Sequence, residues 1–439
     1  MSPRQCSFDT REGATLQRSV LPSGLRVVTE QLPGSRSAAV GMWVAVGSRD
    51  EPTAIAGAAH YLEHLLFKGT AQRSAAAIAE EIDAVGGELN AFTTKEHTCY
   101  HAHVLDRDLD LAIDLICDVL GEALLDPSDV ELERGVVLDE LAMRDDDPEE
   151  SLHDEFCAAL FGSHPLGRPV LGTAESVTAL SRDALHRFYR TRYTPERMVL
   201  AAAGNVSHGA VLAAVTRSFG SRLSGDALPV PPRGGRAEVT DRRRLALSSE
   251  ASEQAHLMLG VRALHRHDER RYALGVLDAA LGGGMSSRLF QQVREQRGLA
   301  YSVYSTVDTY ADIGSLSVYA GCSPPRLGEV AVLIGDVLTE LARDGLSGSE
   351  LARAKGQVRG GLVLGLEDAP SWMSRIGTAE LDYGTHRSVE DELELIDAVS
   401  AQEVGALTRE LLHQPITAAV VGPYAEADQL PDEIAELIA

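Results

Sequence analysis

Met198-Val-Leu-Ala-Ala-Ala-Gly204 is an apolar segment that ends in glycine, and Ile416-Thr-Ala-Ala-Val-Val-Gly422 has the same form near the other end of the chain. Apolar runs of this length predict buried strands. The two glycines are 218 residues apart, and the helical patterns of 109–120 and 328–338 keep this offset. The similar segments 128–131 and 347–350 are shifted by 219 residues. A near-constant offset predicts two similarly folded domains in this chain of 439 residues.

We therefore expect a first domain at 1–220, a linker at 221–244 and a second domain at 245–439. The linker is rich in proline and glycine, which interrupt regular structure. The first half mixes both kinds of element: strands are predicted at 24–30, 37–46 and 90–104, and helices at 54–67, 75–85, 108–124 and 128–144. This mixture predicts an α+β fold, in which each domain is a mainly antiparallel sheet with helices packed on it.

One short motif carries chemistry. His60-Tyr-Leu-Glu63-His64 has the form H-x-x-E-H. On a helix, residues i and i+4 lie on one face, so both imidazoles can reach one cation and Glu63 can reach a water molecule beside it. This is the zincin arrangement reversed, the inverzincin pattern. The alternative is a pair of helix histidines packed among alanine and leucine, with a surface glutamate.

A catalytic zinc site needs a third protein ligand and one open position. Glu133 and Glu140 are seven residues apart in the helical pattern of 128–144, so they share a face after two turns. A helix that offers one carboxylate to the histidine pair would complete a site of two histidines and one glutamate.

The motifs together resemble those of the pitrilysin/insulinase family of metallopeptidases. The stretch from Gly57 to Thr70 is similar to the active-site helix of that family, in the branch with the mitochondrial processing peptidase and its bacterial relatives. The resemblance extends from about Leu21 to Tyr424 and includes 86–100, 281–290 and 294–301. It implies that each chain of two domains forms half of a clamshell.

The resemblance also implies roles for single residues. His60, His64 and Glu140 would hold one Zn²⁺ per chain, with Glu63 as the general base and Glu133 as an accessory catalytic glutamate. Three residues of an edge strand would pair with the substrate backbone, namely Asn90, Ala91 and Phe92. In the second domain, which has no H-x-x-E-H, Arg294 and Tyr301 match family residues that contact substrate near the scissile bond.

Composition limits the partners. Asp and Glu outnumber Lys and Arg by 65 to 40, so the formal net charge is −25. This balance argues against nucleic acid and favours basic peptides or cations. No apolar run is long enough to cross a membrane, the N-terminus lacks a secretory signal, and the five cysteines show no CxxC spacing. We expect a cytoplasmic location, in a bacterium because of the family branch.

Together, the motifs and the resemblance predict a zinc-dependent endopeptidase for unfolded peptides or flexible segments. Family members in a single chain enclose the substrate between two halves, so this shorter chain is expected to form a homodimer, or a heterodimer with a related subunit. In a homodimer, Arg294 and Tyr301 of one subunit would serve the zinc site of the other. Two alternatives stay open: a structural subunit without activity, and a peptide-binding module that needs no metal.

Overall fold

The computed structural model describes residues 4–9, 15–220 and 222–438. The chain divides into two compact units. The first unit comprises Met1–Leu141, Pro169–Pro232 and Leu364–Ser388, and the second comprises Ala142–Arg168, Arg233–Val363 and Val389–Ala439. Each unit therefore contains a segment from the other half of the sequence, which a division at a linker of 221–244 does not capture.

The first unit is built on a sheet of seven strands in the order β1-β2-β3-β7-β4-β6-β5. All neighbours are antiparallel except β3 and β7, which are parallel. The strands are β1 (Arg4–Asp9), β2 (Thr15–Val20), β3 (Arg26–Gln31), β4 (Ser37–Val44), β5 (Glu88–Thr93), β6 (Thr98–Leu105) and β7 (Met198–Gly204). The predicted single strand at 90–104 is wrong, because residues 94–97 form a turn that makes β5 and β6 a hairpin.

The second unit repeats this topology. Its five-stranded sheet has the order β10-β11-β9-β12-β8, and only the pair of β12 and β8 is parallel. Counted from β8, the order and directions match β3-β7-β4-β6-β5 of the first sheet. The strands are β8 (Leu245–Ser249), β9 (Ala255–Ala263), β10 (Ala300–Thr309), β11 (Gly314–Cys322) and β12 (Thr417–Gly422). The α+β prediction is confirmed in both units.

Helices cover both faces of each sheet. The first half of the chain contributes α1 (Ala58–Leu66), α2 (Ala75–Ala84), α3 (Leu109–Glu122), α4 (Pro127–Asp145), α5 (Pro148–Phe161), α6 (Ala174–Ala179), α7 (Arg182–Arg192) and α8 (His208–Ser218). The second half contributes α9 (Arg271–Leu281), α10 (Leu327–Asp344), α11 (Gly348–Leu364), α12 (Ala369–Asp382), α13 (Val389–Ala398), α14 (Ala401–Leu412) and α15 (Asp432–Ile438). None of the described helices is long and apolar enough to cross a membrane.

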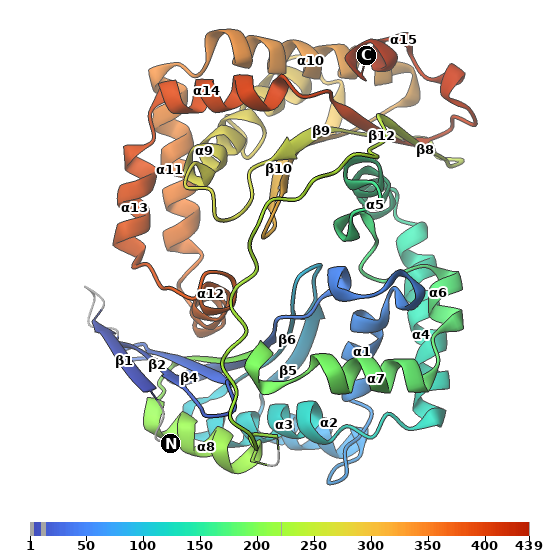
Figure 1. The fold of residues 1–439 in the computed structure, drawn as a ribbon. Coiled ribbons are helices and arrows are strands. Elements are labelled where there is room, and N and C mark those ends of the chain that lie inside the picture. Colours follow the sequence, from blue (N-terminus) through green and yellow to red (C-terminus); the bar gives the residue numbers. More distant parts are fainter. Residues whose placement is uncertain (1–3, 10–14, 221, 439) are drawn as a thin grey trace. The chain divides into compact units, whose positions relative to one another are not determined.

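Alternation along the strands gives the first sheet two apolar faces. On β4, Val40 and Met42 belong to the large core with α1, α3 and α8, whereas Trp43 faces the other way and packs with Met373 and Ile376 of α12. Figure 1 shows α12 on one side of the first sheet and α3 and α8 on the other. This alternation is what a strand buried on both faces requires.

α5 and α12 are exchanged reciprocally between the units. Each has 14 residues, and each follows a long helix of its own half of the chain, α4 with 19 residues or α11 with 17. α12 packs on β7, β4 and β3 of the first unit, and α5 packs on β12, β9 and β8 of the second. Phe156 and Leu160 of α5 join Met258 and Val421 in a small buried core.

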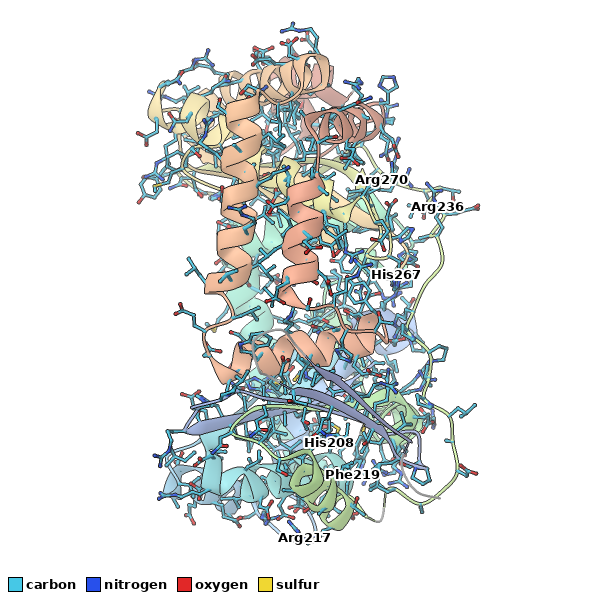
Figure 2. All side chains as sticks on the ribbon, turned by 90° about the vertical axis from the view of Figure 1, so that its left-hand side faces the viewer. His208, Arg217, Phe219, Arg236, His267 and Arg270 are labelled. Carbon is cyan, nitrogen blue, oxygen red and sulfur yellow. The ribbon has the colours of Figure 1, made fainter. Side chains whose placement is uncertain are left out.

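A buried histidine ties α8 to the first sheet. His208 begins α8, and both of its ring nitrogens have hydrogen-bond partners: Nε2 lies 2.7 Å from Oγ of Ser19, and Nδ1 lies 2.9 Å from Oγ1 of Thr29. At the other end of the helix, Phe219 enters the core. Figure 2 shows both residues on the side of the sheet that carries α8.

Candidate metal centre

The helix that bears the H-x-x-E-H motif starts at a glycine that no other residue can replace without strain. Gly57 has φ +92°, and a Cβ atom there would lie 2.6 Å from the carbonyl oxygen of Leu171. The buried carboxylate of Glu51 accepts hydrogen bonds from the backbone N–H groups of Gly57, at 2.8 Å, and Ala59, at 2.6 Å. These bonds satisfy two free donors at the start of α1, where the helix dipole also favours a negative charge.

Two faces of α1 have different tasks. Its apolar face, with Tyr61, Leu62 and Leu65, is fully buried in the core of the first unit. The opposite face presents His60, Glu63 and His64, each of them partly exposed. Because the core holds the helix along its whole length, the polar face has a fixed position, as the helical spacing predicts.

The neighbouring helix α4 is fixed on α1 through Tyr61. The hydroxyl of Tyr61 donates a hydrogen bond to the carbonyl oxygen of Val130, and the guanidinium of Arg134 lies 5.7 Å from the centre of the Tyr61 ring. Arg134 also donates to the carbonyl oxygen of Leu180 at 2.8 Å. Both predicted glutamates, Glu133 and Glu140, project from the anchored helix toward α1.

The structure brings His60, His64 and Glu140 together. Oε2 of Glu140 lies 3.6 Å from Nε2 of His60 and 3.5 Å from Nε2 of His64. One ligand atom from each of the three residues lies within 4.8 Å of the others, and no other group of this kind occurs among the described residues. The two histidine rings meet edge to face at 4.8 Å between centroids.

This arrangement fits a zinc ion. With bonds of about 2.0–2.2 Å, the ligand atoms of a tetrahedral site lie about 3.3–3.6 Å apart. Two nitrogens and one carboxylate oxygen leave the fourth position open, as in catalytic sites. Burial, helped by the neighbouring His64, lowers the pKa of His60 to about 4, so its imidazole is neutral at physiological pH, the form that binds metal.

Glu63 is held by a threonine. Oγ1 of Thr93, at the end of β5, donates a hydrogen bond of 2.5 Å to Oε2 of Glu63. Burial raises the pKa of Glu63, and the hydrogen bond from Thr93 opposes that rise. A carboxylate with a raised pKa is a better proton acceptor, which suits a general base.

Glu133 is not part of the group formed by His60, His64 and Glu140, but its carboxylate contacts His64. It is 2% exposed, and its Oε2 atom lies 3.1 Å from Nδ1 of His64. Its Oε1 atom lies 2.7 Å from Nζ of Lys68. A carboxylate behind a ligating histidine orients the ring and selects its tautomer.

The predicted peptide-pairing residues lie on β5, at the edge of the first sheet. Ala91 packs against the core, whereas Asn90 and Phe92 point to the other face. Phe92 is 37% exposed and meets Trp43 edge to face at 5.7 Å. The outer side of β5 has no strand neighbour among the described residues, so its backbone groups can accept an added strand.

Arg294 and Tyr301 lie together in the second unit. Arg294 belongs to a π-helical turn at Phe290–Glu295, and Tyr301 sits at a bulge where β10 skips one residue in its pairing with β11. The Arg294 guanidinium lies 4.9 Å from the centre of the Tyr301 ring, which is 83% exposed. Both residues line a cavity of about 640 Å³. Both backbone irregularities are typical of functional positions.

Family comparisons agree with this geometry. The family described as Insulinase (Peptidase family M16) matches residues 26–174, and the one described as Peptidase M16 inactive domain matches residues 179–358. The chain belongs to peptidase family M16. The second description agrees with a second half that has no H-x-x-E-H motif.

Several M16 relatives match along nearly the whole chain. A protein from Mycobacterium leprae named uncharacterized zinc protease is 57% identical, covering 95% of this chain and 94% of its own. A Mycobacterium tuberculosis protein with the same description is 56% identical, covering 99% and 100%. A Bacillus subtilis protein, again described in these words, is 40% identical, covering 93% and 98%.

Solved M16-like structures share the fold. A protease from Helicobacter pylori aligns with a TM-score of 0.85 at 22% identity, over 96% of this chain and 100% of that one. A peptidase M16 inactive domain from Pseudomonas fluorescens aligns with a TM-score of 0.83 at 21% identity, over 93% and 98%. At these identities the likeness concerns the fold alone.

Three residues around the M16 motif were not predicted from the sequence: Glu51, Lys68 and Thr93. Lys68 is four residues after His64, so helical spacing places it on the same side as that histidine. Thr93 and Ala91 are two residues apart on β5, so both side chains lie on the same face of the strand, the one toward the helices. Glu51 gives no signal, because a glutamate in a loop is ordinarily a solvated surface residue.

Proposed function

We propose that the chain is a zinc-dependent endopeptidase that hydrolyses unfolded peptides or flexible segments of polypeptides. The observation that carries this proposal is the cluster of His60, His64 and Glu140 with Glu63 on the same helix face. The names of the bacterial relatives and the M16 membership support it.

The residues of the chain divide the work. Zinc, when bound, would lower the pKa of water and polarise the scissile carbonyl. Glu63, held by Thr93, accepts the proton of the attacking water and returns it to the leaving amine. The backbone of Asn90, Ala91 and Phe92 pairs with an extended substrate, so recognition depends on main chain and demands an unfolded segment.

We propose in addition that the chain acts as a homodimer in the cytoplasm of a bacterium. One chain holds both the H-x-x-E-H motif and the pair Arg294 and Tyr301, so two copies of a single gene product supply every element. In this arrangement Arg294 and Tyr301 of one subunit stabilise the carbonyl oxyanion or hold the peptide backbone at the zinc site of the other. The relatives compared above come from bacteria.

Two substitutions test the endopeptidase. Glu63→Gln removes the base and keeps the ligands, so it should retain stoichiometric zinc while peptide hydrolysis falls about 10²–10⁴-fold. Glu140→Ala removes a ligand and should lose zinc together with activity.

Zinc is measured by elemental analysis and hydrolysis by mass spectrometry of products from a peptide library. A Glu63→Gln protein with more than a tenth of the parent activity would exclude Glu63 as the general base. Stoichiometric zinc without any hydrolysis by the parent chain would favour a non-catalytic subunit.

A further inference from the structure

The buried carboxylate of Glu133 connects two groups on α1 and its C-terminal end. One oxygen faces Nδ1 of His64 at 3.1 Å, and the other faces the ammonium of Lys68 at 2.7 Å. The side chain of Glu133 is 3% exposed and that of Lys68 is 34% exposed. A buried carboxylate is costly unless it is paired, and Lys68 supplies the opposite charge.

Lys68 is placed for this contact by the end of α1. The helix ends at Leu66, and the backbone N–H of Lys68 donates a hydrogen bond of 3.1 Å to the carbonyl oxygen of Leu65. This hydrogen bond holds Lys68 in a turn that directly follows the last residue of the helix. The cationic side chain therefore lies at a helix C-terminus, where the helix dipole favours positive charge.

We infer that Lys68 is a positioning residue of the metal centre: it anchors Oε1 of Glu133, so that Oε2 accepts the Nδ1–H of His64 and Nε2 of that histidine stays directed at the cation position. The inference rests on the proposed zinc site, because it gives His64 a fixed tautomer with Nε2 as the free ligand atom. Nε2 is the atom that lies 3.5 Å from Glu140.

The second histidine lacks such a chain of contacts. Nδ1 of His60 is buried and has no hydrogen-bond partner among the described residues. The chain from Lys68 through Glu133 therefore orients one of the two imidazoles only. His64 is the ligand whose ring is fixed before a cation arrives, and a change at Lys68 should act on the site through this ring.

The test measures zinc affinity rather than activity. The metal-free full chain competes with a chromophoric chelator for zinc, in four variants: Lys68→Met, Lys68→Arg, Glu133→Gln and the double variant Lys68→Met/Glu133→Gln. The expected loss is about tenfold for Lys68→Met and about 10–100-fold for Glu133→Gln. The double variant should bind no more weakly than Glu133→Gln alone, because both changes break one chain of contacts. Lys68→Arg should restore most of the affinity.

Lys355→Met is the matched control, because Nζ of Lys355 donates to the backbone oxygen of Asp397 at 2.7 Å and contacts no carboxylate of the site. It should bind zinc as the parent does. Unchanged affinity in Lys68→Met, or losses that add in the double variant, would overturn the inference.

A second readout is taken on the parent chain and needs a variant only to assign its signals. The ¹⁵N chemical shifts of histidine side chains in the metal-free parent should show His64 as the Nδ1–H tautomer, identified by the signal missing in His64→Asn. An Nε2–H tautomer at His64 would overturn the inference. This outcome is separate from the proposed function: a parent chain that binds zinc but hydrolyses no peptide would refute the endopeptidase and leave the affinity and tautomer results intact.

Discussion

A Cβ atom on Gly377 would lie 2.3 Å from Nε1 of Trp43. Gly377 is in the middle of α12, and Trp43 is a fully buried residue of β4. The glycine therefore lets the exchanged helix lie directly on the indole ring. No larger residue fits at this point unless the tryptophan or the helix moves.

Gly377→Ala should consequently destabilise the first unit. The indole is rigid and enclosed, so the added methyl group forces a shift that costs roughly 1–3 kcal/mol. The measurement is the thermal midpoint by circular dichroism. Gly356→Ala on α11 is the control, since its Cβ would meet nothing within 4 Å and alanine is the better helix former. The control should raise the midpoint slightly, and equal midpoints for both variants would contradict the packing described.

Stability should depend on pH through Glu30, a residue of β3 that is 2% exposed. Burial raises its pKa from 4.5 to about 7, with Arg375 opposing the rise. Because the folded-state pKa is the higher one, the folded state holds the proton longer than the unfolded state, so the contribution of Glu30 to stability falls as pH rises from 4.5 to 7. The shift corresponds to roughly 3 kcal/mol.

Glu30→Gln cannot ionise and should escape this loss. The midpoint difference between the variant and the parent should grow in favour of the variant between pH 4.5 and pH 8. Glu80→Gln changes an exposed residue of α2 and should give a difference that does not vary with pH. A flat difference for Glu30→Gln would show that burial does not perturb this carboxyl.

Thr93→Val should slow hydrolysis while zinc stays bound. The change keeps the shape of the side chain and removes the hydroxyl that holds Glu63, so the base is less well aligned in the transition state. We expect kcat to fall about tenfold with little change in KM. Thr93→Ser keeps the hydroxyl and should retain most of the activity. Unchanged kcat in Thr93→Val would show that the hydrogen bond to Glu63 does not align the base.

Mixing two inactive variants tests the shared site of the proposed homodimer. Glu63→Gln chains and Tyr301→Phe chains should each be inactive alone. Heterodimers of the two carry one intact composite site, so activity should return after subunit exchange. Absence of recovery with verified exchange, or a fully active monomer, would refute the shared site. A parent chain that is silent alone but activated by a related subunit would favour the heterodimer.

Much of this architecture could be predicted from the sequence, because it depends on periodic patterns. The constant offset between Gly204 and Gly422 reflects strands β7 and β12, which hold the same place in the two sheets. His60, His64 and Glu140 could be predicted because helical spacing and the family motif agree. The hairpin of β5 and β6 was missed, since its turn Thr94–His97 contains no glycine, proline or asparagine.

Other features depend on which helix packs on which sheet, and a local sequence pattern does not contain this information. Both α5 and α12 have an apolar face, but amphipathic spacing does not say which sheet the face will cover. The contacts of Lys68 with Glu133 and of Thr93 with Glu63 join residues far apart along the chain. They follow from the packing of α4 and β5 on α1, which only the folded chain defines.

The exchange of α5 and α12 also determines when, during synthesis, the helix that covers one face of the first sheet becomes available. All strands of the first sheet have been synthesised by Gly204, but the helix that covers one face of that sheet begins only at Ala369. Until then Trp43, Val199 and their neighbours on this face have no cover from the helix that will bury them. A nascent chain that formed this sheet before α12 was made would expose an apolar face during most of the synthesis of its second half, the kind of surface that chaperones bind.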